Sequence, residues 1–377
     1  MTAPTTAPTT APTAAPTAAP TAAPTAAPSA PPFARFASLR RGDPAPGWLH
    51  RTVLDAWGLP AATSLTLIAV SENATFRVET GGSPVGVLRV HRPGYVADAA
   101  QIEAELHWVR AVGEDTDVRV PEVRALRDGS LVHAFTDETG ARWFAVQFGF
   151  VDGEVLEDVL AAGDVDLDVV RARYAEIGAT TAALHEHVGA WTPPRGFTRF
   201  DWDLDDALGA GSRWGDWRRA ALSPQQRDVC ERGELAARAV LATATPTGLV
   251  HADLRPSNLM VDRAGRLTVI DFDDCGWARL LWDFAAALSF IEHEDFTPAL
   301  ASAWLAGYRT VRPLSEEDLE VAAALSVVRR LQMLGWTTTH RQDALPPAVW
   351  AAQVPGTARV VGEYLRRPRW LFEDGAR

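Results

Sequence analysis

The first half of the chain shows the apolar–polar alternation that is typical of strands packed on one side. Such stretches predict six strands, at Ser64–Val70, Thr75–Glu79, Val85–Val90, Val123–Leu126, Leu131–Phe135 and Trp143–Val151. Gly81–Gly82 separates the second strand from the third, and a turn at Asp128–Gly129 joins the fourth to the fifth. Helices are predicted at Leu49–Trp57 and Ala97–Val112. We therefore expect a small antiparallel sheet with one helix inserted after its third strand.

From Gly153 onward the apolar residues recur at helical spacing. The predicted helices are Val155–Ala162, Leu167–His187, Pro224–Ala242, Leu281–Glu292, Pro298–Thr310, Glu316–Trp336 and Pro347–Leu365. Two short strand signals, Leu259–Val261 and Leu267–Ile270, interrupt them. The expected fold class is α+β, with a β-rich first lobe at residues 33–152 and a larger helical second lobe at residues 153–377. The lobes are expected to meet near Gly149–Gly153.

Composition separates a tail from these lobes. In residues 1–32 proline recurs at every fourth position from Pro4 to Pro28, so we expect a disordered or polyproline-like solubilising tail. A tether and a ligand for a proline-binding module are the alternatives.

The 377 residues are 47% hydrophobic, which is enough for two cores, and their formal net charge is −12. An acidic chain repels nucleic acid and anionic lipid, so neither is an expected partner.

The cysteines and the apolar runs bear on the compartment. Cys230 and Cys275 are too few for a disulfide framework and match no zinc motif. No apolar run reaches the ~18 residues of a membrane span, and the first residues lack the pattern of a secretory signal. We expect a cytoplasmic protein that is not bound to a membrane.

One polar segment carries the candidate chemistry. From His251 it reads HADLRPSNLMVDRAGRLTVIDFDD. Kinase catalytic loops have H-R-D-L-x-x-x-N followed by D-F-G. Asp253 and Asn258 stand at the matching spacing, and Asp271 follows a hairpin-like stretch. An isolated H-x-D would indicate only a turn or a cap, whereas these four residues in this order indicate an active site.

The spacing has a mechanical reason, because phosphoryl transfer needs positioned reactants and neutralised charge. Asp253 is the candidate catalytic residue, which orients or deprotonates a hydroxyl acceptor. Asn258 and Asp271 supply the hard oxygen ligands that Mg²⁺ prefers, at the same end of one hairpin. His251 is expected to pack behind the loop. The segment predicts an ATP- and Mg²⁺-dependent phosphotransferase.

The motifs HADLRPSN and VIDFDD resemble those of the phosphotransferase enzyme family. SENATFRV, VLRVHRPGY and IEAELHWV extend the resemblance from about Ser64 to Trp336. That family includes aminoglycoside phosphotransferases, choline kinases, type II homoserine kinases and stress-response kinases. The IDFDD ending is more similar to the homoserine-kinase and stress-response branch than to the aminoglycoside branch. The resemblance implies a protein-kinase-like fold with ATP, or in some members GTP, as donor.

The resemblance also implies a nucleotide site in the first lobe. Its triphosphate-covering turn corresponds to SENA, with Ser71 and Asn73 as contacts, and an ordinary hairpin turn is the alternative. Kinases present a lysine to the phosphates from the third strand, where this chain has Arg89. Arginine is always charged and makes forked contacts, so it can replace lysine there. The expected helix partner of Arg89 is Glu105, with Glu103 as the alternative.

The strand ending at Phe150 is expected to lead into an adenine-binding hinge. Its base-binding groups are those of Gln147, Phe148 and Phe150, mainly through the backbone. Val87 and either Met260 or Ile270 would form the apolar walls.

Acids and tryptophans accumulate near the expected acceptor pocket. They are Asp201, Asp203, Asp205, Asp206, Asp273, Asp274, Asp283, Glu292, Trp202, Trp214, Trp217 and Trp336. An acidic, aromatic-lined cleft suits an amino-bearing alcohol, through charge and cation–π contacts. The alternative for each residue is a helix cap or a core position. Asp283 in particular is expected to cap or hold the following helix, and Asp273 to contact the metal or hold the catalytic loop.

The sequence thus predicts a kinase whose acceptor is a small hydroxyl compound, such as an amino alcohol, a hydroxy-amino acid, a sugar or an aminoglycoside. A serine/threonine protein kinase of the stress-response type, with a protein substrate, is the alternative. A nucleotide-binding pseudoenzyme, motivated by Arg89, is the third interpretation.

Overall fold

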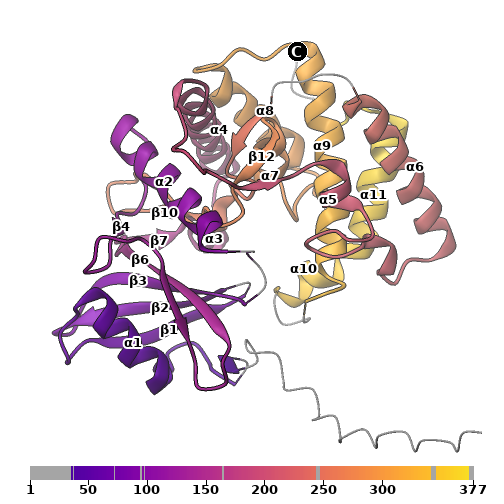
Figure 1. The fold of residues 1–377 in the computed structure, drawn as a ribbon. Coiled ribbons are helices and arrows are strands. Elements are labelled where there is room, and N and C mark those ends of the chain that lie inside the picture. Colours follow the sequence, from indigo (N-terminus) through magenta and orange to yellow (C-terminus); the bar gives the residue numbers. More distant parts are fainter. Residues whose placement is uncertain are drawn as a thin grey trace, which may run out of the picture.

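The structure is a computed structural model that describes residues 35–372, except 37, 72, 94, 95, 97, 164, 243–246 and 341–344. The tail predicted at residues 1–32 lies outside the described residues. A sheet-rich lobe, indigo to purple in Figure 1, is followed along the chain by a helical lobe. The α+β, two-lobed arrangement expected from the sequence is confirmed.

The first lobe is an antiparallel sheet between two helices. Its strands are β1 (Ser64–Val70), β2 (Asn73–Thr80), β3 (Ser83–His91), β4 (Val123–Arg124), β5 (His133–Thr136) and β6 (Arg142–Gly149). They lie in the order β1-β2-β3-β6-β4, and β5 also pairs with β6. Side chains alternate across β6, so Trp143 and Ala145 face helix α1 (Gly47–Trp57) while Phe144 and Val146 share the core of helix α2 (Ala99–Asp115).

The fourth and fifth strands differ from a simple hairpin. The predicted turn is present, and Gly129 N donates to Leu126 O at 3.0 Å. The strands that it joins pair with β6 rather than with each other: β4 lies opposite Gln147 and Phe148, and β5 opposite Arg142–Ala145. They are successive parts of one edge of the sheet, interrupted by a loop.

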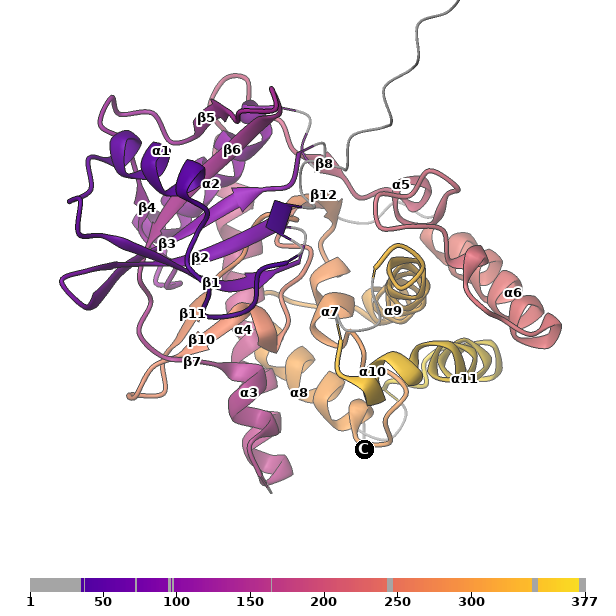
Figure 2. The same ribbon diagram turned by 90° about the horizontal axis from the view of Figure 1, so that it is seen from below.

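The second lobe consists mainly of helices. They are α3 (Leu156–Ala161), α4 (Leu167–Ala190), α5 (Leu204–Leu208), α6 (Pro224–Leu241), α7 (Trp282–Ala287), α8 (Thr297–Arg309), α9 (Glu316–Trp336), α10 (Pro347–Ala351) and α11 (Gln353–Arg366), with 3-10 turns η2 (Trp217–Arg219) and η3 (Pro256–Asn258). Helices α6, α9 and α11 pack side by side (Figure 2). No helix in the described part of the chain has the length and apolarity needed to cross a membrane.

Two small sheets lie among these helices. Their strands are β7 (Glu154–Val155), β8 (Phe200–Asp201), β9 (Thr247–Val250), β10 (Leu259–Val261), β11 (Leu267–Val269) and β12 (Gly276–Arg279). The orders are β11-β10-β7 and β8-β12-β9. Only β10 and β11 were predicted, because strands of two to four residues are too short to show a period.

Two predicted helices are corrected. The helix predicted at Leu281–Glu292 ends at Ala287, and Phe290 beyond it has a φ of +74°, which a right-handed helix excludes. The helix predicted at Pro347–Leu365 is divided at Ala352. Pro355, which follows the break, has no N–H to bond to the carbonyl of Ala351 and continue one helix through.

The connection between the lobes is short and tightly packed. The last strand of the first-lobe sheet ends at Gly149. Strand β7, which follows it, pairs with β10, a strand within the polar segment that begins at His251. Gly153 between them has a φ of +148°, and a Cβ there would lie 2.5 Å from Val261 O. Glycine is therefore required where the chain passes from one lobe to the other.

Helices α4 and α8 provide a test of close packing in the second lobe. A Cβ at Gly178 would lie 2.0 Å from Trp304 O, whereas one at Gly189 on the same helix meets nothing within 4 Å. Gly178→Ala should lower the free energy of unfolding by about 1–3 kcal/mol because the helices must move apart. Gly189→Ala, the matched control, should be neutral or stabilising by up to about 1 kcal/mol. Denaturant unfolding measures both, and equal stability of the two variants contradicts the packing.

Candidate active site

The loop after β9 is held in shape by one buried carboxylate. Asp283, fully buried on α7, accepts from the backbone N–H groups of His251 at 3.1 Å and Ala252 at 2.7 Å. Ala252 has a φ of +69°, so these bonds hold a conformation that non-glycine residues rarely adopt. His185 Nε2 lies 3.2 Å from the same carboxylate. Asp283 therefore supports the loop and holds α7 against it, as one of its two expected roles; it does not cap that helix.

His251 lies behind the loop, as expected. Its Nε2 lies 3.1 Å from Ile270 O, and its Nδ1 accepts from Asp253 N at 3.3 Å. The ring also packs against Phe272, with centroids 4.6 Å apart. These contacts join the catalytic loop to the segment that follows β11.

Asp253 is held both by its own loop and by a distant helix. Asn258 Nδ2 donates to both its backbone O and its Oδ2, each at 2.8 Å, and Arg255 Nε lies 3.4 Å from Oδ2. Arg329, from the distant helix α9, donates to Oδ1. The side chain keeps 16% exposure, so it remains accessible to a reactant.

The hairpin of β10 and β11 brings the two expected metal ligands together. Ile270 N donates to Asn258 O at 3.0 Å, which places the ends of the hairpin side by side. Since Asn258 Nδ2 points at Asp253, its Oδ1, which lies 3.4 Å from Ser257 Oγ, is the atom that could bind a cation. Asp271, with a φ of +62°, keeps 47% of its side chain exposed. One amide oxygen and one accessible carboxylate suit Mg²⁺, which retains waters and phosphate ligands.

Arg89 forms a buried bidentate ion pair with Glu105 of α2. Its Nη2 donates to both carboxylate oxygens, at 2.6 and 2.7 Å, and the side chains are 6% and 1% exposed. Nη1 lies 3.3 Å from Asp271. Burial alone would lower the pKa of Arg89, but the carboxylates of Glu105, Asp273 and Asp271 raise it above its usual value. Of the two candidate partners, Glu105 is thus the residue that Arg89 contacts.

The start of β2 bonds across to the second lobe. Asn73 Nδ2 donates to Asp273 at 2.6 Å, and both residues are buried. Burial, with Asp271 and Asp274 nearby, raises the pKa of Asp273 well above its usual value, which favours the neutral acid. Ser71 is exposed on the turn before Asn73. The side chain of Asn73 therefore joins the lobes, while Ser71 is the one directed to solvent.

The expected hinge residues point in different directions. Phe148 lies on the same face of the sheet as Arg89, whose guanidinium lies 5.3 Å from its ring centroid. The Gln147 side chain lies on the opposite face of the sheet, next to Gly86, and is 1% exposed. Phe150 is 36% exposed after the end of β6. Only backbone atoms of Gln147 could reach a base in the cleft, so the predicted adenine contacts stay a prediction.

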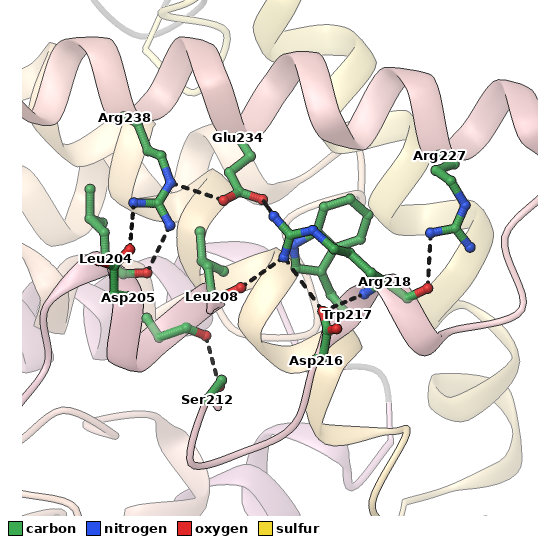
Figure 3. Close-up of polar contacts among 11 residues, drawn as sticks. Leu204, Asp205, Leu208, Ser212, Asp216, Trp217, Arg218, Arg227, Glu234 and Arg238 are labelled. Atoms are coloured by element: carbon green, nitrogen blue, oxygen red, sulfur yellow. Dashed lines mark hydrogen bonds and ion pairs between the residues drawn. The ribbon is translucent and has the colours of Figure 1, made fainter. Parts of the chain in front are cut away.

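Most of the acids expected around the acceptor have structural partners. Asp203 caps α5, and Asp205 pairs with Arg238 at 3.1 Å. Glu292 pairs with Arg330 at 2.8 Å. Trp217 is a core residue that donates to Glu234 at 3.0 Å (Figure 3). For these residues the alternative interpretation, a cap or a core position, is the one that the structure supports.

Comparison with known proteins assigns the chain to a family. The model of the phosphotransferase enzyme family matches residues 64–324. The chain belongs to this family. The membership confirms the family that the motifs of the sequence resemble.

Solved structures show the same fold. A microcompartment-associated aminopropanol kinase is 33% identical, with a TM-score of 0.74 over 85% of this chain and 98% of its own. The amicoumacin kinase hAmiN, solved with AMP-PNP and Ca²⁺, is 18% identical, with a TM-score of 0.65 over 84% of this chain and 92% of its own. The protein-kinase-like fold is thereby confirmed.

The curated relatives are homoserine kinases. That of Rhodospirillum rubrum is 28% identical over 240 residues, 61% of this chain and 67% of its own length. That of Gluconobacter oxydans is 36% identical over 76 residues, 19% of this chain and 24% of its own length. The chain thus matches 24% to 67% of the length of these two relatives.

Two functional candidates were missed in the sequence. Arg329 contacts Asp253, and Arg199 bonds to backbone carbonyls of Gln101, Cys275 and Asp273, joining α2 to the metal-ligand loop. Arg329 and Arg330 stand side by side within the apolar run VAAALSVVRRLQML. Charged residues in an apolar helix must be paired when buried, and this was the available signal.

Asp283 gives a test of loop support. Asp283→Asn keeps the volume but replaces one acceptor oxygen with a donor, so one buried N–H of the loop loses its partner. We expect a loss of about 1–3 kcal/mol in stability and a drop in turnover. Asp166→Ala, which removes the cap of α4 instead, should cost about 1 kcal/mol and leave turnover unchanged. Thermal unfolding and ADP release measure the two effects, and full activity of Asp283→Asn would falsify the role.

Proposed function

We propose that the chain transfers the γ-phosphoryl group of ATP to the hydroxyl of a small amino alcohol or hydroxy-amino acid. The observation that carries this proposal is the meeting of Asp253, Asn258 and Asp271 beside the Arg89–Glu105 pair. These are the acceptor-facing carboxylate, the metal ligands and the phosphate-facing cation that kinase chemistry requires.

Each residue has a defined part in the transfer. Arg89 and the turn at Ser71 hold the phosphates, while backbone groups at Gln147–Phe150 hold the base. Asp253 orients the acceptor hydroxyl and accepts its proton as the oxygen bonds to phosphorus and the bond to ADP breaks. Asn258 and Asp271 would hold Mg²⁺, whose charge neutralises the phosphate oxygens. Asp253 accepts hydrogen bonds from Asn258, so the acceptor and metal sites adjoin.

The acceptor class is supported by the relatives. An aminopropanol kinase and homoserine kinases are among the similar proteins, and the acceptors in these names combine a hydroxyl with an amino group. The carboxylate of Asp274, in the loop after Asp271, provides local negative charge for such an amine. The ion pair of Arg89 with Glu105 supports the use of arginine in the place where kinases have lysine.

A test of the chemistry compares two carboxylates. Asp253→Ala should reduce phosphoryl transfer by about 10²–10⁴-fold and leave nucleotide binding intact, because general-base assistance is lost. Asp271→Ala should instead weaken Mg²⁺-dependent nucleotide binding. ADP release and calorimetric nucleotide titration separate the two outcomes. Near-normal turnover of Asp253→Ala contradicts its assigned role.

A test of the acceptor uses a panel of hydroxyl compounds with ADP release as the readout. Amino alcohols and hydroxy-amino acids should be phosphorylated in preference to sugars and aminoglycosides, and ATP in preference to GTP. Autophosphorylation or labelling of a generic protein, with no small acceptor turned over, would instead favour the protein kinase. Nucleotide binding without any transfer, Mn²⁺ included, would favour the pseudoenzyme.

A further inference from the structure

Arg329 is an unusual neighbour for a catalytic carboxylate, because it is a buried cation from outside the catalytic loop. Its side chain is 1% exposed, and it reaches Asp253 from α9 across 76 positions of sequence. Burial lowers the pKa of Arg329, while Asp253 and Asp274 oppose that shift. A buried arginine is stable only when carboxylates and acceptors surround it, so this placement is specific.

Every edge of the guanidinium is fixed. Nε donates to Ser289 Oγ at 3.0 Å, Nη1 donates to Gln332 Oε1 at 3.0 Å, and Nη2 donates to Asp253. Its face lies 4.6 Å from the ring centroid of Trp214. We call these five residues the Arg329 cluster. A guanidinium that is bonded on three edges and packed on one face has little rotational freedom. It can therefore fix the position of the Asp253 carboxylate that it contacts.

The wall behind the guanidinium is held just as firmly. Trp214 lies in the segment between α5 and η2, and Gly215 after it packs on α9 so closely that a Cβ would lie 2.6 Å from Gly335 O. Thr339 Oγ1 donates to Trp214 O at 3.0 Å. These contacts fix the segment against the same helix that carries Arg329.

A buried glutamate holds the other side of that segment. Glu234 on α6 accepts from Trp217 at 3.0 Å, Arg218 at 2.6 Å and Arg238 at 2.9 Å, and Arg218 also donates to Leu208 O at 2.9 Å (Figure 3). Both ends of the segment that carries Trp214 are thus tied to α6. The position of the Trp214 ring, on which the Arg329 guanidinium stacks, is therefore fixed by contacts elsewhere in the second lobe.

The contacts leave Asp253 one position for a reactant. A carboxylate has about four lone-pair positions. Among the described residues, Asn258 and Arg255 contact Oδ2, and Arg329 contacts Oδ1. The position that is left lies on Oδ1, the oxygen that Arg329 holds.

We propose that Arg329 is a positioning residue that fixes the Asp253 carboxylate so that Oδ1 receives the acceptor hydroxyl. This inference rests on the proposed function and adds to it a determinant outside the catalytic motif. Arg329 touches neither the nucleotide residues nor the metal ligands in the described structure. Its loss should lower the rate of transfer and leave nucleotide binding unchanged.

The test uses Arg329→Lys and Arg329→Met in the full chain. Lysine keeps the charge but cannot hold Ser289, Gln332 and Asp253 together, so kcat should fall about 10- to 100-fold. Methionine should lower it at least as far. The KM for ATP and the calorimetric affinity for nucleotide should stay at wild-type values.

Arg330 is the matched control. It is the next residue on the same helix, equally buried, and ion-paired with Glu292 at 2.8 Å, but it faces α11. Arg330→Lys should lower the midpoint of thermal unfolding and keep wild-type kcat in the folded fraction. Added guanidinium ion, below denaturing concentrations, should raise kcat of Arg329→Ala and not of Arg330→Ala.

Three results would overturn the inference. The first is a wild-type kcat in folded Arg329→Lys and Arg329→Met, and the second is an equal drop of kcat in Arg330→Lys. The third is an equal rise of kcat in Arg329→Ala and Arg330→Ala when guanidinium is added. Failure of the proposed function is distinguishable, because it shows as absent turnover in the wild-type protein measured in the same assay.

Discussion

The buried ion pair between Arg89 and Glu105 is the interaction on which the rest of the site depends. Removing two charges from water costs on the order of several kcal/mol for each ion, so the pair persists only with good geometry. Two contacts, at 2.6 and 2.7 Å, supply it. A planar guanidinium can hold both carboxylate oxygens and still direct Nη1 to Asp271, whereas a lysine has a single compact charge. Arginine at this position therefore joins the sheet, α2 and the loop that carries Asp271 at once.

The position of α2 then determines the loop that follows β11. Trp108, one turn beyond Glu105, packs edge-on against Phe272 with ring centroids 5.3 Å apart. Phe272 contacts His251 in turn, and His251 bonds to both the catalytic loop and Ile270. A shift of α2 would break the ion pair and disturb this stack together. The Arg89–Glu105 pair and the loop that carries Asp253 are thus connected through the side chain of Phe272.

Much of the fold and the loop chemistry could be predicted from the sequence, because both depend on local patterns. The strands, most helices and the order of Asp253, Asn258 and Asp271 follow from periodicity and spacing. What could not be predicted depends on pairings distant in sequence. Arg329 reaches Asp253 only because α9 returns to the loop, and Asp283 supports Ala252 from a helix that starts 30 residues later in the chain. For the acids at the start of α5 the sequence leaves a cap and a ligand as alternatives, because the two look alike in sequence, and Asp203 is a cap.

The residues with strained backbone conformations lie near the groups proposed to act in phosphoryl transfer. Among the described residues, the non-glycine positions with positive φ are Ala252, Asp271 and Phe290, at about 1–2 kcal/mol each. Ala252 precedes Asp253, Asp271 is an expected metal ligand, and Phe290 follows Ser289, which holds Arg329. Each is held by a charged neighbour: Asp283, Arg89, and Arg255, whose guanidinium lies 5.4 Å from the Phe290 ring centroid. The strain therefore coincides with the groups assigned to phosphoryl transfer, as expected of a site shaped before its reactants arrive. On that basis the carboxylate of Asp253 is oriented by the folded chain and does not wait for the acceptor to orient it.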